Sequence, residues 1–329
     1  MNLSQEVHIE PYLREGVSPQ GAAYLFERLK PFGRKLMGLP GLRYLRPAAL
    51  RVAAVAKSPA SLAGRSLAEK RPAPECGSLT VLSANLCHDW PRRRWSAERL
   101  EGFARLVHAQ AADILLVQEV SRSAHLRVDE WLSERLEMGY IYTRANGHET
   151  GIGFEEGLAV FSRFPLKQPR VRQLGSRANP FVRRMALGAQ VDTPCGEVMA
   201  FSVHLGLSPR QNALQLSDLR DWIARSSYGL PALIGGDFNA HENSPRIRQA
   251  RSRWVDAYRQ VRPDGEATTH ELRWPWGGSL RRARLDYIFI DPGRQPWQVL
   301  DAVHLQAEAR PHSDHHAVLA RLAPAPQPN

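Results

Sequence analysis

From residue 79 onward, short apolar runs alternate with stretches whose apolar residues recur at helical spacing. The helical spacing predicts helices over Ala97–Gln110, Leu126–Leu136 and Ser208–Ala224, the last with Ser208 as N-cap and Pro209 in the first turn. Many strands interspersed with helices indicate a layered α/β domain. The apolar runs predict strands over Leu79–Leu86, Asp113–Val117, Gly157–Phe161, Ala186–Val191, Val198–Leu205, Leu233–Gly236, Leu285–Ile290, Val299–Leu305 and Ala317–Leu322.

The first 75 residues have a different pattern. Two helical patches, at 21–29 and 48–56, are separated by prolines, and the stretch 58–74 is rich in Ser, Ala, Pro and charge, which is typical of a linker. We therefore expect three parts: a basic helical extension and linker over 1–75, the α/β domain over 76–323, and a Pro-rich tail over 324–329.

Composition adds a preference for anionic partners. A hydrophobic fraction of 43% and a charged fraction of 23% are ordinary for a globular domain. The formal net charge is +11, of which residues 1–75 contribute +6 through 12 Lys and Arg against 6 Asp and Glu. Such a charge favours nucleic acid, nucleotides or an anionic membrane surface as partners.

The cysteines and the chain ends bear on localisation. Cys76, Cys87 and Cys195 form no CxxC pair, so the sequence predicts no disulfide framework and a reducing compartment. The polar, acidic start predicts no signal peptide, and no run reaches the roughly 20 apolar residues of a membrane span. We expect a cytoplasmic protein, with peripheral membrane association as the alternative.

Polar residues that can bind a metal, transfer a proton or bind a phosphate lie at the ends of the predicted strands. Taken singly, each has a structural explanation, such as a turn residue for Asn85 or a core histidine for His204. Taken together and in this order, they favour one cleft at a sheet edge. The residues are Asn85, Glu119, His204, Asp237, Asn239, Asp286, Asp314 and His315.

The motifs around these residues form an ordered series. In order they are Ser83-Ala84-Asn85-Leu86, Gln118-Glu119-Val120, Glu156-Gly157-Leu158 continuing to Pro165, Val203-His204-Leu205, Gly235-Gly236-Asp237-Phe238-Asn239, Leu285-Asp286-Tyr287-Ile288 and Ser313-Asp314-His315. Over about residues 78–322 the series resembles the endonuclease/exonuclease/phosphatase superfamily, which includes pancreatic deoxyribonuclease, neutral sphingomyelinases, inositol-polyphosphate 5-phosphatases and abasic-site endonucleases. The resemblance implies a four-layer α/β sandwich, with two mixed sheets packed face to face and helices outside.

The resemblance also implies a divalent metal, Mg²⁺ with Mn²⁺ as a second option. Glu119 is the best ligand candidate, because it is an isolated carboxylate after a buried strand and hard cations prefer oxygen ligands. Asn85 would bind the metal or orient Glu119. Asp314 would contribute a second carboxylate.

Two histidines resemble the proton-transfer groups of the family. His315 corresponds to the general base and Asp286 to the carboxylate that holds it. The near-neutral pKa of histidine suits proton transfer, and a carboxylate fixes the tautomer of the ring. His204 corresponds to the histidine that binds the phosphate or serves the leaving group. In the deoxyribonuclease branch, the carboxylate at the position of Glu156 pairs with that histidine.

The remaining candidates act on the water and on the phosphate. By resemblance, Asp237 and Asn239 would orient the attacking water and bind a phosphate oxygen, and we assign proton abstraction jointly to Asp237 and His315. A phosphate-binding arginine is expected before the His204 motif. Arg183 and Arg184 both fit, and strand alternation would point only one of them inward.

A zinc site is a weaker alternative. The run from His312 to His316 contains three histidines and Asp314, but zinc needs three or four His or Cys ligands at defined spacing. No paired half-site lies upstream, and Cys87 stands alone. The sequence therefore favours a magnesium site.

We expect a Mg²⁺-dependent phosphodiesterase acting on nucleic acid. The alternatives are a sphingomyelinase- or phosphoinositide-type phosphodiesterase or phosphatase, and a catalytically idle binding member. The run Gln118–Ser121 departs from the Gln-Glu-Thr-Lys of abasic-site enzymes, and 5-phosphatase motifs are missing. Residues 1–75 would dock on a membrane or a partner, cover a sheet edge or remain a solvated appendage. Residues expected beside the cleft are Arg172, Arg177, Arg183 and Arg184, then Arg281, Arg282 and Arg284, and Trp274 and Trp276.

Overall fold

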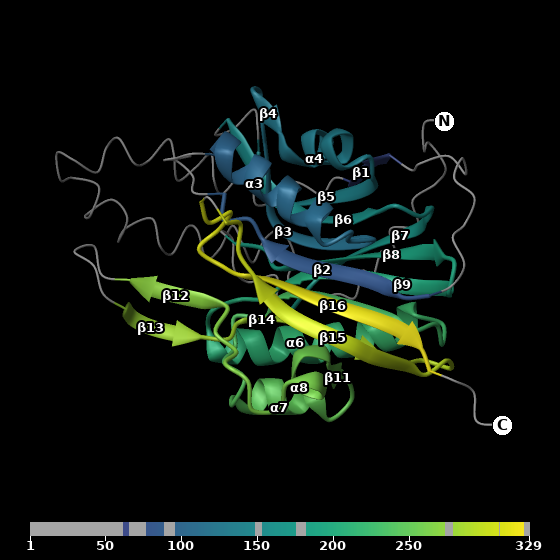
Figure 1. Cartoon of the computed structure of the whole chain (residues 1–329). Helices are drawn as coiled ribbons and strands as arrows, with labels where there is room; N and C mark the ends of the chain where they lie inside the picture. The colour runs from purple at the N-terminus through teal and green to yellow at the C-terminus, as the bar shows by residue number, and fades with distance from the viewer. Residues whose placement is uncertain are drawn as a thin grey trace, which may run out of the picture.

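Two β-sheets pack face to face, with helices on both outer sides (Figure 1). The computed structural model describes residues 62–65, 77–88, 96–148, 153–175, 182–273, 279–308 and 310–325. Both sheets contain parallel and antiparallel pairs. The architecture is the four-layer α/β sandwich that the sequence predicted, which is therefore confirmed.

The first sheet has eight strands in the order β1-β5-β6-β3-β2-β16-β15, with β4 paired to β3. β2 and β3 are parallel, and the other pairs are antiparallel. The strands are β1 Leu62–Arg65, β2 Leu79–Asn85, β3 Ile114–Ser123, β4 Leu126–Arg127, β5 Gly139–His148, β6 Phe154–Ser162, β15 Trp297–Leu305 and β16 Ala317–Pro324.

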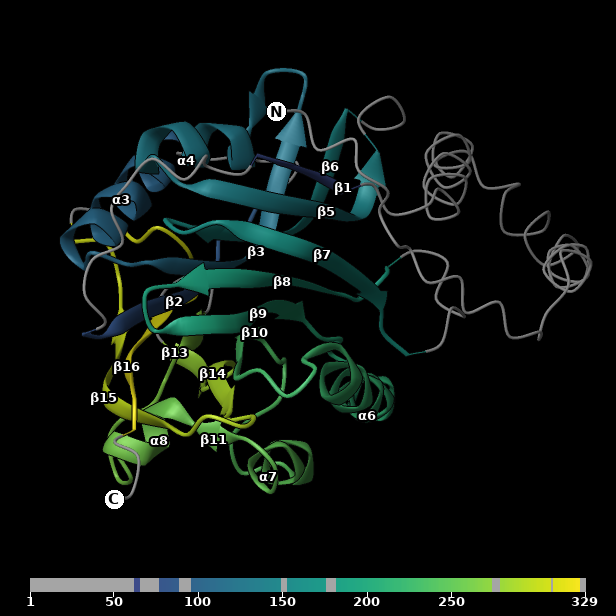
Figure 2. The same ribbon diagram turned by 90° about the vertical axis from the view of Figure 1, so that its right-hand side faces the viewer.

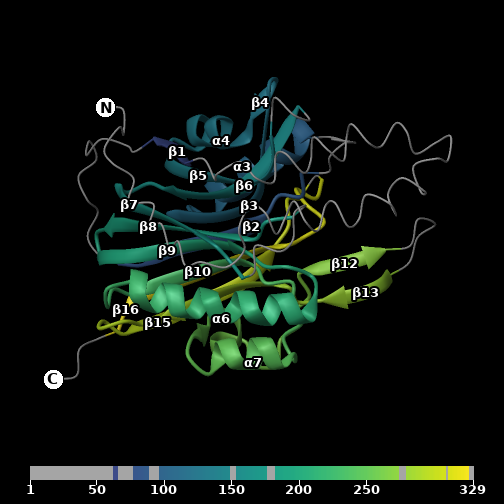
Figure 3. The same ribbon diagram turned by 180° about the vertical axis from the view of Figure 1, so that it is seen from behind.

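The second sheet has six strands in the order β11-β14-β10-β9-β8-β7, of which β9 and β10 are parallel. They are β7 Leu166–Gln173, β8 Met185–Thr193, β9 Gly196–His204, β10 Ala232–Asp237, β11 Val255–Asp256 and β14 Asp286–Asp291. A separate hairpin of β12 His270–Arg273 and β13 Ser279–Ala283 projects from the sandwich (Figures 1 and 3).

Three apolar layers hold the sandwich together. Between the sheets, residues such as Leu116 of β3 and Leu233 of β10 belong to one buried cluster. The helices α3 Ser96–Ala109 and α4 Val128–Leu136 cover the outer face of the first sheet, while α6 Pro209–Ser226 and α7 Pro245–Arg251 cover the second (Figure 2); a short helix, α8 Ala257–Val261, packs beside β15. Because both faces of each sheet are covered, the central strands β2 and β6 are buried at every position and are rich in apolar residues.

The two sheets approach each other closely at β10. A Cβ atom on Gly235 would lie 2.6 Å from Leu116 Cδ1 and 2.9 Å from Ser83 Cβ, both on the first sheet. Any larger residue at this position would therefore collide with the opposite sheet. Gly235 lies two residues before Asp237, so this contact sets the spacing between the sheets next to a candidate catalytic residue.

Some predicted elements differ from the observed ones. The stretch predicted as a linker contains β1, which pairs antiparallel with β5 at the sheet edge. Residues 126–127 form β4, so the helix predicted from Leu126 begins at Val128. The strands β5 and β7 and the β12–β13 hairpin had no predicted counterpart. The helical patches at 21–29 and 48–56, Arg177, both hairpin tryptophans and the tail after 325 lie outside the described residues.

The cysteines correct one expectation. Cys195 is disulfide-bonded, whereas Cys87 is a free thiol. Disulfides persist mainly in oxidising compartments, so this bond does not support the reducing compartment inferred from the cysteine pattern. Among the described residues, no helix has the length and apolar character needed to cross a membrane.

Candidate active site

The topology brings the predicted strand-end residues to one edge of the sandwich. β2 and β3 run parallel, so Asn85 is paired with Gln118 and lies next to Glu119. In the second sheet, Asp237 at the end of β10 is in register with His204 at the end of parallel β9. It is equally in register with Asp286, because β14 runs antiparallel and begins where β10 ends.

Backbone irregularities aim two of these side chains. The β3–β6 register shifts between Val117 and Val120, which inserts a bulge at Glu119, and Glu119 has φ 55°. Asn239 has φ 48°. A left-handed conformation is costly for residues other than glycine, and such outliers concentrate at functional sites. The bulge re-aims Glu119 out of the regular alternation of the strand.

Asn85 connects the two sheets at this edge. Its Nδ2 atom donates to Glu119 Oε1 at 3.2 Å and lies 3.3 Å from Asp237 Oδ2, across the sandwich. Its Oδ1 atom accepts a hydrogen bond from the Cys87 amide at 3.0 Å. Of the two roles expected for Asn85, the contacts therefore match the one that orients Glu119.

Asp237 lies at the centre of the site and is almost fully buried. Its Oδ1 atom accepts from the Asn239 backbone amide at 2.8 Å, and its Oδ2 atom accepts from the Asn239 side chain at 3.2 Å. Burial and the neighbouring charge of Asp286 raise the pKa of Asp237 to about 7. This carboxylate is therefore poised to exchange a proton near neutral pH.

His315 forms a short contact with a buried carboxylate. Its Nδ1 atom lies 2.8 Å from Asp286 Oδ2, and Thr269 Oγ1 donates to the same oxygen at 2.6 Å. Burial alone would lower the pKa of His315, but the charge of Asp286 and this hydrogen bond raise it to about 10. The pair leaves Nε2 of His315 as the nitrogen that can act on a substrate.

His204 is buried beside Asp237, with 3.5 Å between His204 Nε2 and Asp237 Oδ2. Burial, and then the charge of Arg184, hold the pKa of His204 well below its usual range, so the ring is neutral. The expected pairing with Glu156 is not observed among the described residues. Glu156 instead accepts a hydrogen bond from Asn146 at 2.6 Å. Asn146 lies opposite Glu156 on the neighbouring strand β5.

The two arginine candidates occupy different environments. Arg183 is buried, and its Nε atom donates to the Ala145 carbonyl oxygen at 2.7 Å. Arg184 is only partly buried, and its charge acts on both His204 and Glu156. Both border a pocket of about 210 Å³ that Gly206 and Leu207 also line. The geometry favours Arg184 for phosphate binding and a structural role for Arg183.

We expect Arg184→Ala to lower kcat/KM by about 10- to 100-fold, mainly through KM, because a hydrogen bond to a charged group is worth about 1.5–3 kcal/mol. Arg183→Ala is the matched control. It should lower the melting temperature by several degrees while kcat/KM stays near wild type. Steady-state kinetics and thermal melts of both variants check this, and the reverse assignment would show Arg183 lowering kcat/KM.

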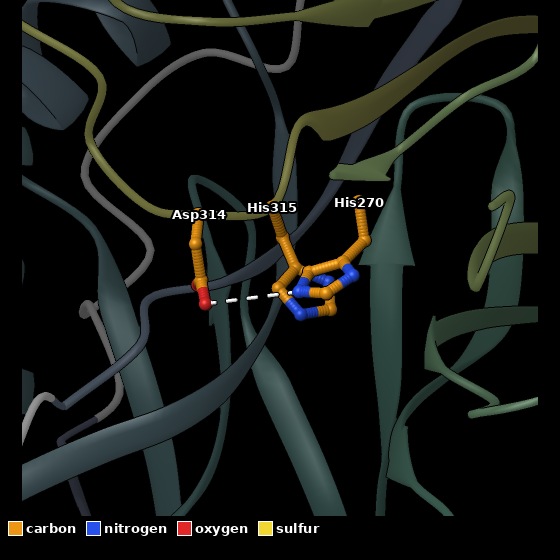
Figure 4. A group of neighbouring side chains, drawn as sticks. All are labelled: His270, Asp314 and His315. Atoms are coloured by element: carbon orange, nitrogen blue, oxygen red, sulfur yellow. Dashed lines mark ion pairs between the residues drawn. The ribbon is translucent and has the colours of Figure 1, made fainter. Parts of the chain in front are cut away.

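Three residues at the site had no predicted role. His88 Nε2 lies 3.5 Å from Glu119 Oε2, and its backbone amide also donates to that atom at 3.2 Å. Thr269 holds Asp286, as described above. His270 begins β12, and its ring lies 4.5 Å from that of His315, with Asp314 alongside (Figure 4). Their chain neighbours carry no strand-end motif, so only the fold reveals them.

The residues fit a hard divalent cation. Glu119 and Asp314 offer carboxylate oxygens of the kind that Mg²⁺ prefers. Burial and the charges of these two residues raise the pKa of the Cys87 thiol to about 12. Asp237, Asp286 and His315 form a second group whose possible ligand atoms lie within 4.8 Å of one another.

Not all of the predicted basic residues face the cleft. Arg172 pairs with Asp218 at 2.6 Å, and Arg284 is buried in an ion pair with Asp256 at 2.6 Å, so neither is available to substrate. Arg281 and Arg282 are exposed on β13. Within the described residues, the expected basic surface is therefore smaller than the sequence suggested.

One family model matches the greater part of the chain. The model described as the endonuclease/exonuclease/phosphatase family matches residues 82–315, which include the site residues from Asn85 to His315. The chain belongs to the endonuclease/exonuclease/phosphatase family. Membership indicates a metal-dependent hydrolase of phosphoester bonds, and the resemblance drawn from the motifs is confirmed.

Relatives and solved structures agree with this family. The uncharacterized protein YbhP of Escherichia coli strain K12 is 28% identical over 177 residues, which span 49% of this chain and 67% of that protein. An endonuclease/exonuclease/phosphatase from Beutenbergia cavernae superposes with TM-score 0.60 at 22% identity, covering 75% and 72% of the two chains. D. rerio TDP2 complexed with a single strand DNA product gives TM-score 0.58 at 16% identity, covering 74% and 98%. These two structures share the fold of this family member.

Proposed function

We propose that this protein is a Mg²⁺-dependent phosphodiesterase that cleaves nucleic acid. One observation carries the proposal: Asn85 contacts both Glu119 and Asp237, so the candidate metal carboxylate and the candidate proton-transfer group lie within one side chain of each other. The Asp286–His315 pair completes the same cluster. A phosphodiester needs charge neutralisation and proton transfer at one point, and this edge of the sandwich supplies groups for both.

The protein's own groups have separable tasks. The cation would be held by Glu119 and Asp314, and when bound it would neutralise charge that develops on the phosphate. Asp237 takes the proton of the attacking water, and His315, held in its charged form by Asp286 through Nδ1, donates from Nε2 to a phosphate oxygen. Asn239 directs Asp237 through two hydrogen bonds.

The phosphate and the leaving group would contact Arg184 and His204 at the edge of the second sheet. Arg184 offers the guanidinium that binds a non-bridging phosphate oxygen, since its partly exposed side chain borders the pocket and its charge acts on His204. The neutral ring of His204 donates or accepts a hydrogen bond at the leaving oxygen without adding another charge.

Charge favours nucleic acid, and one apolar feature favours a lipid as the second candidate. The net charge of +11 attracts polyanions, and the similar TDP2 structure is complexed with single strand DNA. Beside Arg184, however, the pocket is bordered by Leu207 and Leu214, which are 74% and 61% exposed. Exposed apolar side chains next to a phosphate site would also suit a phospholipid headgroup at a membrane surface.

The salt response separates these substrates. Plasmid DNA, single-stranded DNA, RNA and sphingomyelin vesicles should be tested with Mg²⁺ between about 50 and 200 mM salt. For nucleic acid, kcat/KM should fall about tenfold or more over this range, because bound counterions are released. A double Leu207→Gln/Leu214→Gln variant should leave nucleic acid cleavage intact. The lipid function would be established instead if vesicle turnover did not change with salt and was lost in this variant. Binding without turnover of any substrate would indicate a catalytically idle member.

A further inference from the structure

His270 lies at the mouth of the cleft, although it belongs to the projecting hairpin. A β-bridge joins it to His315, 45 residues later in the chain, and the two rings lie 4.5 Å apart. Its Nε2 atom is 3.8 Å from Asp314 Oδ2. Figure 4 shows the three side chains gathered around one point, with the ion pair between Asp314 and His270 drawn as a dashed line.

We propose that His270, Asp314 and His315 form a binding site for a transition metal of the Zn²⁺ class, which shares Asp314 with the Mg²⁺ site that Glu119 provides. One ligand atom from each of the three lies within 4.8 Å of the others. Two ligands about 2.1 Å from a tetrahedral ion are roughly 3.4 Å apart, so the 3.8 Å between His270 and Asp314 needs only a small closure.

The donor atoms select the metal. Mg²⁺ prefers an all-oxygen shell, whereas two imidazoles and one carboxylate suit Zn²⁺, Co²⁺ and similar ions. Asp286 already accepts from Nδ1 of His315 at 2.8 Å, which leaves Nε2 as the ligand atom. A carboxylate behind a ligating histidine fixes its orientation and raises its basicity, as in many zinc sites.

The site is open to solvent and electrostatically attractive to cations. The side chains of His270 and Asp314 are 22% and 53% exposed, so an ion can enter from solvent without a conformational change. The Cys87 thiol hydrogen-bonds to Asp314 and is not one of the three proposed ligands. Sequence spacing predicted no zinc site because no ligand pair lies upstream, and the hairpin supplies the missing histidine.

Occupation of this site would stop the reaction that we propose for the cleft. A cation on His315 Nε2 would displace the proton of that nitrogen, so the ring could no longer donate a hydrogen bond to the phosphate. The same ion would also draw Asp314 away from the Mg²⁺ site. The protein would therefore be inhibited by Zn²⁺ in the presence of Mg²⁺, a consequence that rests on the proposed function, whereas the binding itself does not.

The binding test needs no substrate. Co²⁺ is titrated into the Mg²⁺-free full chain, and its visible d–d absorption reports nitrogen ligation, with Zn²⁺ added to displace it. We expect His270→Ala to weaken Co²⁺ binding at least about tenfold, since even an outer partner of a metal ligand is worth 10- to 100-fold. Cys87→Ser is the control that should bind as wild type. Thermal melts confirm that both variants are folded.

The activity test separates inhibition from catalysis. With Mg²⁺ present, His270→Ala should need at least about tenfold more Zn²⁺ for half inhibition, measured relative to its own rate without Zn²⁺. Equal Co²⁺ affinity in wild type and His270→Ala would overturn the site, as would loss of binding in Cys87→Ser alone. If no substrate is turned over, the proposed function fails, while the Co²⁺ titration still decides the site.

Discussion

Glu119→Gln is expected to abolish Mg²⁺-dependent hydrolysis, with kcat/KM reduced by at least about 10²-fold. The substitution keeps the side-chain shape and the bond from Asn85, but it removes the charge that a hard cation needs. A metal that stabilises the transition state contributes several kcal/mol, and each 1.36 kcal/mol is a factor of ten in rate. Hydrolysis measured against Mg²⁺ concentration, together with Mn²⁺ binding by calorimetry, checks the expectation.

Glu130→Gln is a matched control for this substitution. Glu130 lies on α4 and forms an exposed ion pair with Arg127, 3.3 Å away, so removing its charge should change neither metal affinity nor turnover. Full activity of wild type in a chelator would show that no metal is required. Unchanged metal affinity in Glu119→Gln would indicate that the metal is held instead by the group of Asp237, Asp286 and His315.

Alanine substitution of either active-site histidine should reduce kcat by about 10²- to 10⁴-fold while the fold is retained. This is the usual contribution of a positioned proton-transfer group. For His315 the loss should be largely reproduced by Asp286→Asn, because both changes remove the same oriented imidazole. The double variant should then be little worse than either single one, since groups that act as a unit are not additive.

His304→Ala provides the comparison for a purely structural histidine. Its ring stacks on Tyr258 with 4.1 Å between centroids, and burial lowers its pKa to about 3. This variant should melt at a lower temperature with normal kcat. If His204→Ala and His315→Ala behave in the same way, with only a fewfold loss of kcat, the chemistry lies elsewhere in the molecule.

The layered fold could be predicted because the central strands are buried on both faces. β2 and β6 are buried along their whole length and contain apolar runs, and α3 has a clear apolar stripe, so the hydrophobic pattern identifies them. β7 was missed because it is an edge strand with charged residues and a proline, which carry little strand signal. β1 was missed because a four-residue edge strand has too few positions to show a period.

The candidate site could be predicted where each residue follows an apolar strand. Asn85, His204 and Asp237 have that context, and the structure brings them together. Arg183 and Arg184 precede β8, so strand alternation does not decide between them, whereas the hydrogen bond from Arg183 to the Ala145 carbonyl oxygen does. His270 could not be predicted, because its contact with His315 comes from a bridge between a hairpin and a distant loop.

The close approach of the sheets at Gly235 has a consequence for refolding. Glu119 and Asn85 belong to one sheet, whereas His204, Asp237 and Asp286 belong to the other, and both sheets are built from strands far apart in the chain. Long-range pairings of this kind form slowly. Catalytic activity would therefore return only when the sheets dock, later than the far-ultraviolet circular dichroism signal of the strands. We expect the circular dichroism signal to form in a rapid first phase and turnover to recover later. The recovery of turnover would then report the docking of the two sheets.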